Sequence, residues 1–174
     1  MALTGVTSLP RVVKLGGAWV ENYSYVDGDT FAKGDLIRIT SGGEINLCAL
    51  DSDTNGALHG IVLETRASEV NTQVSVLLFA EDTEIAIQCV DSGAPATILP
   101  GQIESLEGGT GAWGILANET KGIVMVVGRL GSNRPWVAGP ASTGDSYDEV
   151  TTTNNNSVVV RVLASVLVGR AAAA

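Results

Sequence analysis

A stretch of two-residue alternation punctuated by glycine, residues 30–62, constrains the fold of this chain more than any other feature. Isoleucine alternates with polar residues over 36–40, and a glycine turn follows at 41–43. A second alternating run covers 44–50, and the stretch closes with the apolar run 60–62. Alternation with a period of two, bounded by glycine turns, is typical of antiparallel hairpin strands. The stretch therefore predicts a small β unit.

A weaker copy of this unit begins at Ile98. Gly101 stands where Gly34 stands, and the spacing from this glycine to the next glycine pair is 42 − 34 = 8 residues in one copy and 108 − 101 = 7 in the other. The run Gly122-Ile123-Val124 matches Gly60-Ile61-Val62. Repeats of this kind indicate one supersecondary unit used more than once. The alternative is a hairpin pattern common to many β proteins.

We therefore predict two related units, at about residues 30–90 and 98–170, of which the second carries an irregular insertion at 131–156. A valine-rich strand is expected late in each unit, over 74–79 and 158–167. Residues 73–80 and 84–90 are expected to pair as a hairpin.

The composition favours an all-β fold, either a β-barrel or a β-sandwich. The chain has 174 residues, 45% of them hydrophobic, and 21 glycines against 5 prolines. That length supports one substantial core, and no long stretch has helical periodicity. We expect an extended arm at 1–10 and a single β domain at 11–174.

The net charge of −9, from 10 basic and 19 acidic residues, argues against a nucleic-acid partner. Affinity for DNA or RNA comes mainly from neutralising phosphates with basic side chains. We also expect no membrane partner, because no apolar run reaches the length of a membrane span. The first residues lack the basic head and apolar run of a secretion signal, so synthesis in the cytoplasm is expected. The preferred partner surface is then apolar or locally basic.

Few residues suggest chemistry. His59 is the single histidine, and no nucleophile or phosphate-binding motif accompanies it. Catalytic and zinc sites need several groups held together, so we predict no enzyme activity and no cofactor. Cys48 and Cys89 lie among apolar residues and are read as two buried thiols, with a disulfide between them as the alternative.

The segment containing Asp51, Asp53 and Asn55, followed by Gly56, resembles the first half of a calcium loop. The second half is missing, because the twelfth position is Val62 and not glutamate. The same residues suit an ordinary turn, since Asp and Asn side chains close turns and Asn-Gly tolerates positive φ. A turn is favoured, and a weak divalent-ion site is the alternative.

Candidate contact residues come from three segments. The arm offers apolar side chains, the insertion offers a lone tryptophan of the kind that anchors contacts, and the most apolar segment, 157–168, has apolar residues on both faces. Residues of that last segment are expected in the core or in a trimer interface. The candidates are Leu3, Val6, Leu9, Trp136, Val158, Val160 and Val162.

The order Phe31-Ala32-Lys33-Gly34-Asp35, Ser41-Gly42-Gly43, Gly60-Ile61-Val62 resembles the pattern of capsid decoration (cement) and head accessory proteins of tailed phages. The resemblance implies a β-barrel or sandwich without catalytic residues, often trimeric, bound to the major capsid protein on the outside of the virion. The expected function is to stabilise the capsid shell. Three alternatives stay open: a head-fibre base or tail-tip module that binds host glycan, a small β enzyme, and a polymer-forming shell protein.

Overall fold

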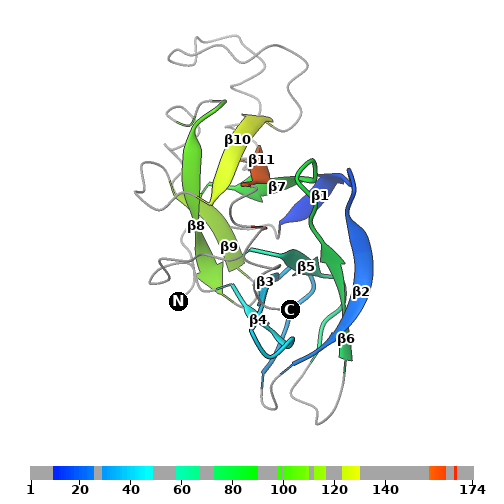
Figure 1. The fold of residues 1–174 in the computed structure, drawn as a ribbon. Coiled ribbons are helices and arrows are strands. Elements are labelled where there is room, and N and C mark those ends of the chain that lie inside the picture. Colours follow the sequence, from blue (N-terminus) through cyan, green and yellow to red (C-terminus); the bar gives the residue numbers. More distant parts are fainter. Residues whose placement is uncertain are drawn as a thin grey trace.

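The computed structural model describes residues 10–25, 29–48, 58–66, 73–89, 98, 100–109, 112–116, 123–129, 157–163 and 167. Every regular element in these ranges is a β-strand, which confirms the predicted all-β class (Figure 1). The strands are β1 (Arg11–Lys14), β2 (Trp19–Ser24), β3 (Leu36–Ile39), β4 (Ile45–Leu47), β5 (Gly60–Val62), β6 (Gln73–Leu78), β7 (Glu84–Gln88), β8 (Ile103–Gly109), β9 (Ala112–Leu116), β10 (Val124–Arg129) and β11 (Ser157–Val162).

The strands form two antiparallel sheets that are not closed into a barrel, so the sandwich alternative is the one observed. One sheet has six strands in the order β1-β7-β11-β10-β8-β9, and the other has five in the order β2-β6-β5-β3-β4. Figure 1 shows β2 and β6 running along one side of the molecule and β8 and β10 along the other.

The predicted hairpin between residues 73–80 and 84–90 is wrong. Strand β6 pairs with β2 and β5, whereas β7 pairs with β1 and β11 in the other sheet. The turn between them is closed by bonds of its own, from Thr83 N to Ala80 O (3.0 Å) and from Ala80 N to Thr83 Oγ1 (2.9 Å). The chain therefore turns a corner from one sheet into the other, and it does the same between β1 and β2.

These two corners bind each other. Gly17 N donates to Asp82 Oδ1 (2.9 Å), and Thr83 Oγ1 donates to Leu15 O (3.0 Å). Gly16 has a φ of +54°, and a Cβ at this position would lie 2.2 Å from Asp82 Oδ1. Glycine is therefore required where the two corners meet.

The strands β2–β6 and β7–β11 share strand order and register, and from here on they are called the first unit and the second unit. The repeat in the structure thus assigns β7 to the second unit, whereas the first unit predicted at 30–90 includes its residues. In the first unit Ile61 pairs with Leu77, and in the second Met125 pairs with Arg161, so the offsets are 125 − 61 = 64 and 161 − 77 = 84. The same offsets convert the pair Glu21 and Val76 into the pair Ile85 and Val160. Two ladders thus match residue for residue.

Irregular contacts repeat as well. Gly34 N donates to Val62 O and Gly101 N donates to Val126 O, both at 2.8 Å, and the two glycines have φ values of 93° and 86°. A parallel bridge between Tyr25 and Ile45 has its counterpart between Cys89 and Ile115.

These bonds correct the alignment of the repeat. Because Val62 corresponds to Val126, the counterpart of Gly60-Ile61-Val62 is Val124-Met125-Val126, two residues later than the matched run Gly122-Ile123-Val124. The difference in residue number between equivalent positions of the two units rises from 64 at β10 to 84 at β11. The second unit therefore has 84 − 64 = 20 more residues between β10 and β11 than the first unit has between β5 and β6. That interval contains 131–156, which lies outside the described residues.

Two apolar clusters form the core. The main cluster joins both sheets and includes Leu36, Ile61 and Leu77 of the first unit. The second cluster lies on the opposite face of the first unit and includes Ile37 and Val62, which directly follow Leu36 and Ile61 in their strands. The first unit is therefore apolar on both faces, because adjacent residues of a strand point to opposite sides.

The valine-rich strand expected over 158–167 is shorter than predicted. β11 ends at Val162, and Leu167 N donates to Leu163 O (3.2 Å), a spacing of four residues that is not a strand bond. Val159 and Arg161, on the face away from the core, are only partly buried. Within the single chain β11 is therefore buried on one face, and the expected cover of its other face by a trimer interface stays a prediction.

Candidate interaction surface

The structure places three of the predicted contact residues in the core. Val158, Val160 and Val162 have exposed fractions of 0%, 0% and 3% and belong to the main cluster. Their side chains fill the interior of this chain and are not accessible to another one. The other candidates lie outside the described residues: Leu3, Val6, Leu9, Asp51, Asp53, Asn55 and Trp136.

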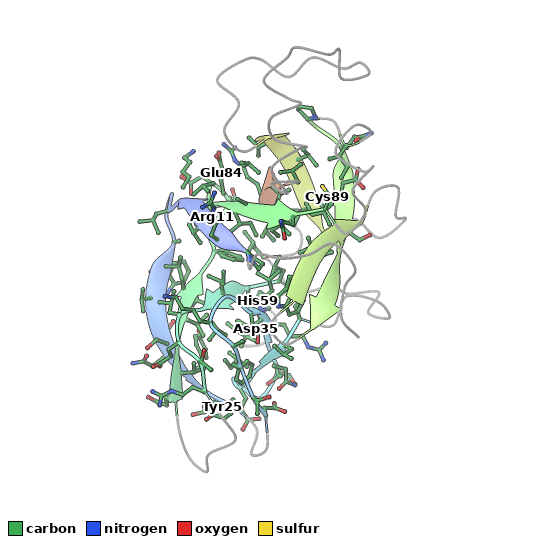
Figure 2. The ribbon with its side chains drawn as sticks, turned by 180° about the vertical axis from the view of Figure 1, so that it is seen from behind. Arg11, Tyr25, Asp35, His59, Glu84 and Cys89 are labelled. Atoms are coloured by element: carbon green, nitrogen blue, oxygen red, sulfur yellow. The ribbon has the colours of Figure 1, made fainter. Side chains whose placement is uncertain are left out.

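Asp35 is a buried carboxylate between the two units (Figure 2). Its Oδ1 accepts from Trp113 Nε1 (2.9 Å), and its Oδ2 accepts from Ala32 N (2.7 Å). A buried carboxylate held by an indole N–H and a backbone N–H is positioned to join segments rather than to react, since its oxygens are already engaged. We assign Asp35 a structural role.

His59 is buried and hydrogen-bonded within the first unit. Its Nδ1 accepts from Ile39 N (2.7 Å), and its backbone N donates to Ile37 O (2.8 Å). Nδ1 must be unprotonated to accept this bond, so the imidazole substitutes for a strand carbonyl. The ring ties β3 to the residue before β5.

Cys48 and Cys89 are buried thiols that are not joined by a disulfide, in agreement with the favoured prediction. Within the described ranges, no three His, Cys, Asp or Glu residues are grouped so that they could hold a metal ion. The described part of the chain also contains no helix long and apolar enough to cross a membrane.

Four exposed apolar residues lie on β1, on β2 or in the turn between these strands. We call Val13, Leu15, Trp19 and Val20 the edge patch; their exposed fractions are 42%, 59%, 43% and 59%. Ile103, at 51%, is the remaining large apolar residue of the described ranges that is exposed, and it lies on β8. Trp19 and Val20 are neighbours in β2, so the exposed apolar residues lie on both faces of this edge strand. Exposed apolar area of this kind is a candidate contact surface.

A polar cluster borders the edge patch on β2. Glu21 Oε2 accepts from Trp19 Nε1 (3.3 Å) and from Tyr23 OH (3.2 Å). Residues 19, 21 and 23 share one face of the strand, so the carboxylate lies between two aromatic rings. The surface combines apolar area with one negative charge.

The corner beneath the patch is fixed by Asp82. The hydrogen bond from Gly17 N, which favours the ionised carboxylate, holds the pKa of Asp82 below its ordinary value of 3.8. On the other side of the first unit, the bond from Ser75 N likewise lowers the pKa of Glu64. Both carboxylates anchor backbone rather than face a ligand.

Sequence reasoning did not identify the edge patch. The available signal was a pair of adjacent apolar residues in each strand, Val12-Val13 and Trp19-Val20. A strand with one buried face is expected to alternate apolar and polar residues, and these pairs break that alternation. On an edge strand, one residue of each pair must face solvent. Neither the family models nor the curated protein sequences searched contain a match to this chain.

Proposed function

We propose that this protein is a structural virion component that binds the outer surface of a phage capsid and stabilises the shell. The observation that carries the proposal is the edge patch: four apolar side chains stand exposed at one corner of a sandwich whose other large apolar residues in the described ranges are, with the exception of Ile103, buried or partly buried. A surface of this kind fits protein contact. The acidic charge of −9 fits an apolar or basic partner.

Such a protein works by mass action. A ligand that binds the assembled shell but not the dissociated subunits stabilises the shell in proportion to its occupancy. No bond is made or broken, so the role needs only contact surface. In this proposal the partners are the major capsid protein and, through a homotrimer, further copies of the chain. Leu3, Val6, Leu9 and Trp136 stay predicted contacts.

Co-sedimentation with capsids that lack a decoration protein tests the proposal. The wild-type chain should pellet with the capsids, saturate at a fixed ratio and raise the temperature at which the shells release DNA. The double variant Leu15→Ser, Val20→Ser should pellet less while keeping its fold, because both side chains are exposed. Ile103→Ser, exposed but on another strand, is the matched control. Absence of the wild-type protein from the capsid pellet would reject the function.

A second candidate function is glycan binding by a head-fibre base or tail-tip module. It is favoured by one observation, the carboxylate of Glu21 between Trp19 and Tyr23. Aromatic faces next to a hydrogen-bonding carboxylate suit sugar rings, which present C–H groups and hydroxyls together. Binding of the isolated protein to a glycan array, abolished by Trp19→Ala, would favour this candidate over capsid binding.

A further inference from the structure

The outer edge of β2 presents backbone groups that no described strand uses. Leu63 N donates to Ser75 O (2.9 Å) and Ser75 N donates to Glu64 Oε1 (3.0 Å), so the backbone of Ser75 faces the β5 side of β6. Asn22 is the partner of Ser75 in the β2–β6 ladder. In an antiparallel pair, alternate residues point their N–H and C=O away from the partner strand. Asn22 therefore points these groups outward.

The same alternation applies to Val20 and Ser24, so three outward N–H and C=O pairs line this edge. The side chains along β2 are exposed except at Tyr23, which is half-buried. A row of backbone donors and acceptors at a sheet edge is a template for strand addition.

The second unit shows this position filled. β7 is the counterpart of β2, since 84 − 20 = 64 and 86 − 22 = 64, and β1 pairs antiparallel with it. In that ladder Lys14 lies opposite Glu84 and Arg11 opposite Ala86, and Lys14 Nζ is 3.6 Å from Glu84 Oε1. The fold therefore accepts an antiparallel strand at the position that no described strand occupies beside β2.

The side chain of Glu21 indicates which residue a strand added to β2 should place opposite it. Its counterpart Ile85 is fully buried beneath β1 and lies opposite Val12. At the same position the first unit has an exposed carboxylate, so a strand added to β2 needs a basic side chain there. Val20, beside it and 59% exposed, needs an apolar neighbour.

A second copy of the chain does not meet this requirement. A second β2 contains no basic residue and adds a second carboxylate to the edge, so it does not supply the positive charge that would complement Glu21. Of the other described edge strands, β4 and β9 contain no basic residue, and β1 already lies on β7. In the register it adopts there, β1 would place Val12 opposite Glu21. The described edge strands of a second copy therefore do not supply the complement of the β2 edge.

We propose that the β2 edge binds an extended segment of a partner protein as an added antiparallel strand, with a lysine or arginine opposite Glu21 and an apolar residue beside Val20. This inference rests on the proposed function and specifies which kind of segment its contact surface binds. The inference and the proposed function can be rejected separately, because strand addition is measured without capsids and capsid binding can occur through other contacts.

The test uses two synthetic peptides and the full chain. Both peptides alternate valine and threonine, and they differ only at the centre, which is lysine in one and glutamate in the other. By NMR, the lysine peptide should slow amide hydrogen exchange at Val20, Asn22 and Ser24, and by calorimetry it should bind roughly threefold or more tightly than the glutamate peptide. Glu21→Gln should reduce that preference. Equal affinities, or unaffected β2 amides, would overturn the proposal.

Asn22→Pro removes one outward N–H and should weaken binding of the lysine peptide roughly tenfold relative to Asn22→Ala, which removes the same side chain but keeps the N–H. Equal binding by the two variants contradicts strand addition. If the proline variant does not fold, the exchange measurement on the wild-type chain decides alone. Protection of the three amides that rises with protein concentration, without peptide, would show that a second copy fills the edge and would overturn the proposal.

Discussion

The indole N–H of Trp113, in β9, donates a 2.9 Å hydrogen bond to the carboxylate of Asp35, just before β3, and this bond joins the second unit to the first. Both residues are fully buried, and Figure 2 shows Asp35 at the middle of the molecule. The counterpart of Asp35 in the second unit is Gln102, because Val62 N bonds to Asp35 O as Val126 N bonds to Gln102 O. The carboxylate is therefore a feature of the junction and not of the repeated unit.

Trp113→Phe should destabilise the protein by about 1–3 kcal/mol, because it removes a donor from a buried carboxylate and leaves the ring volume largely filled. The free energy of unfolding in urea measures the loss. Trp19→Phe, at an exposed tryptophan, should change stability by less than about 0.5 kcal/mol. Similar losses for both variants would show that the bond to Asp35 does not hold the units together.

Gly60→Ala should destabilise the protein by about 1–3 kcal/mol, the usual cost of overpacking. A Cβ on Gly60 would lie 2.6 Å from Leu77 O and 2.8 Å from Val76 Cγ1, so a backbone in the neighbouring strand would have to move. Gly128→Ala is the matched control, since a Cβ there has nothing within 4 Å, and it should stay within about 0.5 kcal/mol of wild type. Thermal melts of the two variants give the comparison.

Asp82→Asn should weaken the protein at neutral pH and lose that effect in acid. The pKa of Asp82 in the folded chain lies below its ordinary value of 3.8, so folding is favoured by this carboxylate at pH values above 3.8. The contribution disappears as the pH falls through the lowered folded value. Urea midpoints of wild type and variant should therefore converge in acid. A gap that stays constant with pH would mean that the Gly17–Asp82 bond does not depend on charge.

Glu84→Gln should loosen β1 from the six-stranded sheet and cost about 1 kcal/mol. Glu84 accepts from Arg161 Nε (3.0 Å) and lies 3.6 Å from Lys14 Nζ, so one carboxylate connects β11, β7 and β1. Hydrogen exchange of the β1 amides should become faster. Lys14→Met, at a half-exposed partner, should cost less than about 0.5 kcal/mol, and a larger loss there would reverse the ranking of the two contacts.

The sequence predicted the fold class and most strands, because alternation and glycine turns are local properties. Gly34 and Gly101 have the positive φ that their turn positions require, and the strands near 36, 45, 103 and 113 form as expected. Which strands pair is decided by contacts distant in sequence. The corner at 80–83 looked like a hairpin turn, and only the bond from Gly17 to Asp82 shows why it crosses between the sheets.

The glycines made the repeat recognisable in the sequence, but matching identical residues also gave the wrong alignment of its last strand. Identical letters placed Gly122-Ile123-Val124 on Gly60-Ile61-Val62, whereas backbone hydrogen bonds place Val124-Met125-Val126 there. The paired apolar neighbours Val12-Val13 and Trp19-Val20 were the only sequence signal of the edge patch that we found, because the exposure of Val20 depends on the position of β2 at the edge of its sheet. Several predicted sites, including Asp51 and Trp136, lie outside the described residues and stay predictions.

The matched registers of the two units also bear on the ancestry of the chain. Two halves that repeat a bond as irregular as the one from Gly34 to Val62 have the arrangement that duplication of a half-length gene produces. In a fused chain the two halves are free to differ at equivalent positions. Glu21 and Ile85 are such a pair, so one strand position carries an exposed carboxylate in one half and a buried apolar side chain in the other.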